Sequence, residues 1–261
     1  LPRAFDQAPK PARQEHDDGE ETAADDVNVS IEEGEVIGVI GANGAGKTTF
    51  VNMVTGYLTP TSGRLYFYDR DITGFDPKHA TELGICRSFQ IPQLFATATT
   101  FENLLIAMGV AETGAMPFWR PLAEPDRGAR CEEVLRRYQI HEYRDQLTQT
   151  LPQGVRKLLD IAMASVHEPK LLMLDEPTSG VTAAEKFSIM DIVVTALREQ
   201  NVTILFVEHD MEIVARYATR VLAFYDGRII ADEAPEEALR DPQVREYVIG
   251  ETLHLDETAQ G

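Results

Sequence analysis

A glycine-rich loop at residues 41–48, which reads GANGAGKT, constrains the fold more than any other part of the chain. It matches the phosphate-binding pattern G-x-x-x-x-G-K-[ST] at every fixed position. The run before it, EVIGVI at residues 35–40, is short and apolar, as a buried parallel strand should be, and residues 48–57 read as a helix. Because the pattern requires this order of strand, loop and helix, the sequence predicts an α/β fold of the phosphate-loop NTPase type with a parallel sheet.

The residue types in this loop suit the phosphates and the metal ion of a bound nucleotide. Its glycines let backbone N–H groups turn inward as an anion nest, and the following helix adds the positive end of its dipole. Lys47 brings a compact positive charge to the β- and γ-phosphates, and the Thr48 hydroxyl is a ligand for Mg²⁺. A glycine-rich turn without a ligand is the alternative, which the flanking strand and helix disfavour. We expect the nucleotide to contact Gly41, Ala42, Asn43, Gly44, Ala45, Gly46, Lys47, Thr48 and Thr49.

The charge and the apolar pattern argue against several classes of partner. The chain has 261 residues and a formal net charge of −19, which disfavours a nucleic-acid partner and direct binding to anionic lipids. No apolar run approaches the roughly 18–20 residues that span a bilayer, and the first residues lack an apolar signal core. Cys86 and Cys131 lie far apart and are expected to be reduced packing thiols. We therefore expect a cytoplasmic protein that reaches a membrane only through a partner.

The chain divides into a core, an insertion and two tails. Residues 1–26 are rich in proline, alanine and acidic residues without periodicity, and they are predicted to be a disordered acidic tail. The α/β core is expected at residues 27–100 and 151–250, and a C-terminal tail at 251–261. Residues 101–150 are expected to form a helical insertion, because apolar residues there recur at helical spacing and prolines separate two such stretches.

Periodicity predicts further elements within the core. Short apolar runs predict strands at residues 64–68, 84–89, 171–174 and 202–207. Longer segments predict helices at residues 155–167 and 183–200. In the insertion, the residues that fit one of two helical faces are Leu104, Leu105, Met108, Val134, Leu135 and Tyr138.

A second set of motifs completes a nucleotide site. Residues 171–176 read LLMLDE, an apolar strand that ends in an acidic pair, and Asp175 can hold the metal through water. A core strand that ends at the surface is the alternative. Against it, Gln90 follows a predicted strand, LPQGV at residues 151–155 opens a helix, and His209 follows the VTILFV strand.

In this order, the motifs resemble those of the ATP-binding subunit of an ABC transporter, and the resemblance covers residues 27–250. RSFQIPQLF before TFENL, and VEHDMEIV before a YVIG ending, resemble the branched-chain amino acid uptake group, of which urea and short-chain amide systems are relatives. The resemblance implies an ABC ATPase domain at 27–250 that hydrolyses ATP with Mg²⁺. It also implies a second ABC ATPase subunit, transmembrane permease subunits and an external solute-binding protein. The chain would then lie on the inner face of the cell membrane.

The resemblance further implies a site shared between two subunits. ATP would lie between the phosphate loop of one subunit and the LPQGV segment of the other. The residues that would contact ATP in trans are Pro152, Gln153 and Gly154. The residues that would surround Mg²⁺ are Thr48, Gln90 and Asp175.

Three side chains would carry the catalysis that the resemblance implies. Glu176 would be the general base that polarises the attacking water, although positioning in line accounts for most of the rate. Gln90 would contact Mg²⁺ and this water, and His209 would hydrogen-bond the γ-phosphate and orient Glu176. Taken alone, His209 is equally a packing residue at a strand end.

The sequence departs from the family pattern at three places. The usual signature LSGGQ is replaced by LPQGV, so Pro152 supplies neither a hydroxyl nor an N–H, although Gly154 and the helix dipole remain. We expect a working site with fewer trans contacts; a slow or inactive site is the alternative. Asp18 and Gly19 stand where an adenine-stacking ring is usual, so we expect GTP to compete well with ATP. Thr182 replaces an acidic or amide residue that is frequent in the family.

Several functions remain to be distinguished. The leading one is the energy-coupling ATPase of an importer, docked to its membrane subunit near Pro92, Leu94 and Phe95, some of which are expected to be core residues instead. A soluble ABC ATPase of translation or DNA repair, a nucleotide-binding regulator or partner that hydrolyses little, and a nucleoside kinase are the alternatives. Neither the transported solute nor the choice between a homodimer and a heterodimer follows from the sequence.

Overall fold

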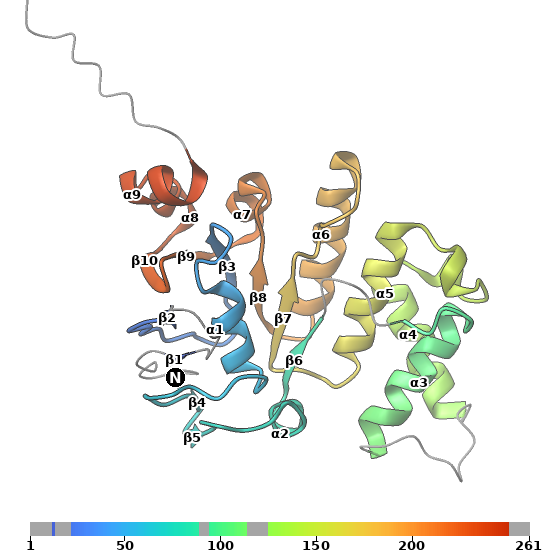
Figure 1. Ribbon diagram of the computed structural model, residues 1–261. Helices are drawn as coiled ribbons and strands as arrows, with labels where there is room; N and C mark the ends of the chain where they lie inside the picture. The colour runs from blue at the N-terminus through green and yellow to red at the C-terminus, as the bar shows by residue number, and fades with distance from the viewer. Residues whose placement is uncertain (1–11, 14–21, 89–93, 114–124, 251–261) are drawn as a thin grey trace, which may run out of the picture.

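The computed structural model describes residues 12–13, 22–88, 94–113 and 125–250 of the chain. Its centre is a six-stranded sheet in the order β10-β9-β3-β8-β7-β6 (Figure 1). These strands are β3 (Val36–Gly41), β6 (Ile85–Arg87), β7 (Leu171–Asp175), β8 (Thr203–Val207), β9 (Arg220–Tyr225) and β10 (Arg228–Glu233). The pairs among β9, β3, β8, β7 and β6 are parallel and only the β10–β9 pair is antiparallel, so the predicted α/β fold with a mainly parallel sheet is confirmed.

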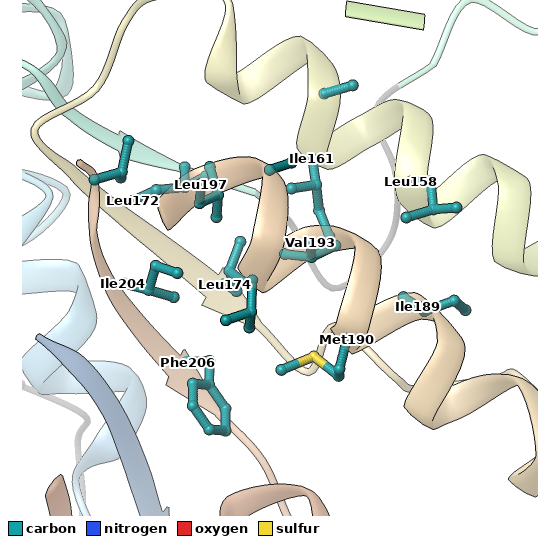
Figure 2. Close-up of a cluster of buried hydrophobic side chains, with 14 of the residues drawn as sticks. Leu158, Ile161, Leu172, Leu174, Ile189, Met190, Val193, Leu197, Ile204 and Phe206 are labelled. Atoms are coloured by element: carbon teal, nitrogen blue, oxygen red, sulfur yellow. The ribbon is translucent and has the colours of Figure 1, made fainter. Parts of the chain in front are cut away.

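Helices cover both faces of this sheet. On one face lie α5 (Gln153–Ser165), α6 (Ala183–Arg198) and α7 (Met211–Tyr217), and on the other lies α1 (Lys47–Val54). Alternate residues of each strand enter the two cores: Ile204 and Phe206 of β8 pack toward α6, whereas Leu205 packs toward α1. Figure 2 shows the first of these cores, where side chains of α5 and α6 lie over β7 and β8. Strands buried on both faces explain why their sequences are continuous apolar runs.

The insertion is helical, and it packs beside α5. It contains α3 (Thr100–Thr113), α4 (Pro125–Arg137) and the 3₁₀ turns η1 (His141–Tyr143) and η2 (Thr148–Thr150). Figure 1 shows α3 and α4 on the α5 side of the molecule, away from β9 and β10. The six residues that periodicity assigned to helical faces are all buried at 7% exposure or less.

Small elements complete the fold. Two small antiparallel sheets pair β1 (Ala12–Arg13) with β2 (Thr22–Ala24), and β4 (Tyr66–Phe67) with β5 (Arg70–Asp71). The remaining helices are α2 (Pro77–Glu82), α8 (Pro235–Ala238), α9 (Pro242–Val244) and the π-helix η3 (Arg245–Ile249). Among the helices that the structure describes, none has both the length and the apolar character needed to cross a bilayer.

The boundary predicted for the N-terminal tail is wrong at its C-terminal end. Residues 22–26 belong to the fold, because Ala24 is buried at 3% exposure and the Asp25 N–H donates to the Gly227 carbonyl at 2.8 Å. Arg228 also pairs with the Asp25 carboxylate. The acidic composition of residues 22–26 suggested disorder, but contacts with the β9–β10 turn hold this segment in the fold.

Candidate nucleotide site

The lysine of the phosphate loop forms hydrogen bonds with the backbone of the same loop. Lys47 is the first residue of α1, and its Nζ donates to the carbonyl oxygens of Gly41 at 2.6 Å and Ala42 at 2.8 Å. Gly44 and Gly46 have φ values of +79° and +100°, in the left-handed region that favours glycine. The ammonium is thus held at the mouth of the loop, next to the start of a helix.

Lys47 is almost removed from water, with 7% of its surface exposed. Burial lowers its pKa below the ordinary value, while the nearby charges of Glu176 and Asp175 act in the opposite direction. The acidic pair predicted from LLMLDE therefore lies close enough to Lys47 to stabilise its charge. Parallel strands explain this proximity, because the carboxyl ends of β3 and β7 meet at the same edge of the sheet.

Asp175 is held by an arginine that the sequence reasoning missed. The Arg87 Nη2 lies 2.6 Å from Asp175 Oδ2, and its Nη1 donates to Asn52 Oδ1 at 2.7 Å. Arg87 ends β6 and Asn52 lies on α1, so the guanidinium joins three elements around the Asp175 carboxylate. The only sequence signal for Arg87 was its position three residues before Gln90.

The oxygen atoms near the loop suit a hard cation such as Mg²⁺, which is bound partly by the protein and partly by the phosphates of a nucleotide. Among the residues that the structure describes, no group of three or more His, Cys, Asp or Glu side chains could hold a metal ion. A hydroxyl on Thr48 and a carboxylate on Asp175, with phosphate oxygens and water, match the way Mg²⁺ is bound at nucleotide sites. Gln90, the third expected ligand, lies outside the described residues.

Glu176 follows β7 in an unusual backbone conformation. Its φ is +47°, which is rare for a residue other than glycine. Its N–H donates to the Val207 carbonyl at 3.0 Å, and its carbonyl accepts from the Ser179 N–H at 3.1 Å. The Glu176 Oε1 then lies 3.3 Å from Nε2 of His209, whose side chain is about half exposed. His209 therefore faces Glu176 rather than filling the core.

A buried carboxylate next to His209 ties these segments together. Glu208 is 4% exposed, and its Oε1 accepts from the Thr178 N–H at 3.0 Å and from the Thr178 hydroxyl at 2.7 Å. Its Oε2 accepts from the His209 N–H at 3.3 Å. Glu208 has no part in the site predicted from the sequence, although it directly precedes His209.

The LPQGV segment forms the start of α5. Pro152 is the N-cap residue, with φ −55° and ψ 151°, and it makes no side-chain cap. Gly154 is buried, and a Cβ atom there would lie 3.1 Å from Ile189 Cδ1. A Cβ on Gly180 would lie 3.5 Å from the Gln153 side chain, so this segment adjoins the turn after Glu176. Asp18, Gly19 and Pro92 lie outside the described residues.

Sequence comparison shows which family the chain belongs to. A sequence model of the ABC transporter family matches residues 24–179. The chain is 34% identical over 244 residues to the probable branched-chain amino acid transport ATP-binding protein LivG of Methanocaldococcus jannaschii, covering 89% of this chain and 93% of that protein. It is 32% identical over 236 residues to the high-affinity branched-chain amino acid transport ATP-binding protein BraF of Pseudomonas aeruginosa, covering 88% and 92%.

Solved structures lead to the same conclusion. The crystal structure of the ADP conformation of an ATP-binding cassette of an ABC transporter matches with a TM-score of 0.81 at 30% identity, over 95% of this chain and 99% of that one. A nucleotide-free ATP-binding cassette from an ABC transporter matches with a TM-score of 0.79, also at 30% identity, over 93% and 98%. The chain belongs to the ABC transporter family and has the fold of its ATP-binding cassette.

Proposed function

We propose that this chain binds and hydrolyses ATP to power a membrane importer of branched-chain amino acids or a related small polar solute. The transport role rests on the relatives, which are themselves described as branched-chain amino acid transport ATP-binding proteins. The observation that carries the hydrolytic role is the contact between Glu176 and His209, 3.3 Å apart, at the sheet edge that holds Lys47.

In this proposal the loop binds the phosphates and the acidic pair activates water. Lys47 and the backbone of residues 41–49 bind the β- and γ-phosphates. Thr48, Asp175 and Gln90 hold Mg²⁺, which when bound neutralises charge that develops on the phosphates. Glu176 orients the attacking water and accepts its proton, while His209 donates a hydrogen bond to the γ-phosphate and keeps Glu176 in place.

The proposed partners follow from the same assignment. A second ATPase subunit would present Pro152, Gln153 and Gly154 to this chain's ATP. Permease subunits would hold the chain on the inner face of the cell membrane and receive solute from an external binding protein. Phe95 and Leu147 favour a docking surface near the insertion, since they are 52% and 41% exposed.

Hydrogen bonds place these two residues on adjoining segments. The Thr148 N–H donates to the Ala98 carbonyl at 3.0 Å, and the Gln149 N–H donates to the Ala96 carbonyl at 3.1 Å. Leu94 instead packs partly against the core, as some residues of this segment were expected to do. We therefore propose Phe95, from the expected segment, together with Leu147, which the sequence did not indicate, as exposed apolar residues of this docking surface.

A second candidate function is a nucleotide-binding subunit that hydrolyses little and pairs with a more active homologue. Pro152 favours it, because a proline at the N-cap of α5 offers a partner's ATP neither a hydroxyl nor an N–H. The presence of both Glu176 and His209 favours the active form.

Transport measurements test the importer role. The chain would be reconstituted in proteoliposomes with branched-chain amino acid permease subunits, the second ATPase subunit and the solute-binding protein. ATP-dependent leucine uptake that Glu176→Gln abolishes supports the proposal. If leucine uptake persists with Glu176→Gln in this chain but needs an active second ATPase subunit, this chain is the weakly hydrolysing partner. Failure of the chain to join the permease subunits contradicts both.

A further inference from the structure

A buried lysine lies under the proposed catalytic centre. Lys157 is on α5, two residues after the LPQGV segment, and only 2% of its surface is exposed. Its Nζ donates to the backbone carbonyl of Glu176 at 3.2 Å. Lysine is almost never this deeply buried unless its charge is compensated, so the position needs an explanation beyond packing.

The surroundings of Lys157 provide that compensation. Asp160, on the same helix, is 7% exposed, and Glu208 of the His209 segment is 4% exposed. The charges of Asp160, Glu176, Asp175 and Glu208 all favour the ammonium form, and they oppose the fall in the Lys157 pKa that burial causes. Lys157 thus lies next to the acids at the carboxyl ends of β7 and β8.

Glu176 needs support of this kind. A left-handed backbone at a residue other than glycine persists only where the surroundings hold it. Val207 on β8 accepts from its N–H, the Ser179 N–H donates to its carbonyl, and Lys157 donates to the same carbonyl from α5. We infer that Lys157 is a positioning residue, which fixes the Glu176 backbone so that its carboxylate lies beside His209.

This role would also connect two nucleotide sites, a consequence that rests on the proposed function. The N-terminus of α5 would contact ATP bound by the partner subunit, whereas Lys157 on the same helix holds Glu176 of this chain's own site. Because a helix moves nearly as a rigid body, ATP binding in one site would shift Glu176 in the other.

Hydrogen exchange tests the inference without requiring ATPase activity. We would compare Lys157→Met with Lys157→Arg in the full chain, reading exchange in peptides that cover residues 172–180. Lys157→Met is expected to speed exchange there by about tenfold, with little change in β3 and in the α3–α4 insertion. Lys157→Arg, which keeps the charge, should restore most of the protection.

A matched control separates this effect from general loosening. Arg127, 3% exposed, is also a buried cation, and it pairs with Glu112 in the insertion at 2.6 Å. Arg127→Met should speed exchange in α3 and α4 and leave residues 172–180 unchanged. The inference is overturned if Lys157→Met leaves residues 172–180 as protected as in the wild type, or loosens the whole chain evenly. If Lys157→Met does not fold, Lys157→Leu, which also lacks a donor, is read against the same criteria.

Turnover supplies a second readout and keeps the two hypotheses apart. Titration with a fluorescent ATP analogue gives the number of sites that bind nucleotide, and kcat is expressed per such site. Lys157→Met should lower kcat by about tenfold or more without weakening nucleotide binding, because Glu176 is displaced while the loop is intact. An unchanged kcat per site contradicts the role of Lys157. If the wild type itself does not hydrolyse ATP, the proposed function fails, and hydrogen exchange still decides the role of Lys157.

Discussion

At the scale of single residues, the site is held by charges that are buried but paired. Lys47, Lys157 and Glu208 are each less than a tenth exposed. Lys47 binds carbonyls of its own phosphate loop, whereas Lys157 and Glu208 contact the backbone of Glu176 and His209. Removing one partner of such a set leaves the others desolvated and uncompensated, which costs more than the contact itself contributes.

The close approach of β9 to the phosphate loop gives one prediction. A Cβ atom on Gly41 would lie 2.6 Å from the Phe224 carbonyl, and backbone cannot move away as a flexible side chain would. We expect Gly41→Ala to destabilise the chain by about 1–3 kcal/mol and to weaken ATP binding. Urea unfolding and nucleotide titration measure the two effects, and Asn43→Ala in the exposed part of the loop is the control for the stability measurement alone. Equal stability of Gly41→Ala and wild type would contradict the close approach.

A second residue-scale prediction concerns acid stability. The Lys186 ammonium, 2.7 Å from the Asp210 carboxylate, holds the pKa of Asp210 below its ordinary value. A lowered folded-state pKa contributes stability above the unfolded pKa of about 4, and this contribution is lost as the pH falls through the folded value. Urea unfolding should therefore show wild type more stable than Lys186→Met at pH 6, with the difference shrinking toward pH 3. A constant difference across this range would exclude the ion pair as its source.

At the scale of elements, the sequence predicts those helices and strands that carry a local signal, either an apolar periodicity or a short motif. The strand, loop and helix around Lys47 were expected within a few residues of their observed bounds, since a buried strand and a glycine loop are local signals. β9 and β10 were not predicted, although Asp226 and Gly227 form a typical hairpin turn between them. The parallel pairing of β9 with β3 joins segments far apart in sequence, and no local pattern reveals it.

The same limit applies to the polar contacts of the site. Arg87 stands in a predicted strand and Lys157 in a predicted helix, and neither position reveals the residue that it contacts. Only the folded arrangement brings Arg87 to Asp175 and Lys157 to Glu176, because each pair joins different elements. Asp175 was expected from its place at the end of a buried strand, whereas the roles of Glu176 and His209 were expected from the family resemblance. Parallel topology gathers all three at one edge of the sheet.

The start of α5 gives an element-scale prediction. Pro152→Ser supplies a hydroxyl and an N–H where the N-cap has neither, and we expect it to raise kcat severalfold in the assembled dimer. Stability should change by less than about 1 kcal/mol, since a new cap offsets the lost rigidity of proline. Pro152→Ala adds the N–H alone and isolates the hydroxyl. Lower turnover in Pro152→Ser than in wild type would contradict the assigned contact.

At the scale of the whole molecule, the site is proposed to be complete only between two subunits. Glu176→Gln should bind ATP without consuming it, so ATP should hold two copies together. Light scattering is expected to give about twice the mass of the chain when ATP is added to this variant, and the monomer mass without ATP. A monomer in both conditions would favour pairing with a homologous chain instead.

The most direct test of the account is Mg²⁺-dependent ATP hydrolysis by the purified chain, measured beside Glu176→Gln. The account predicts clear turnover in the wild type and its loss in Glu176→Gln, with ATP binding retained in both because Lys47 and the loop are unchanged. Wild-type turnover that persists in Glu176→Gln would contradict the assignment of Glu176 as the base. ATP binding without turnover in either protein would contradict hydrolysis by this chain alone.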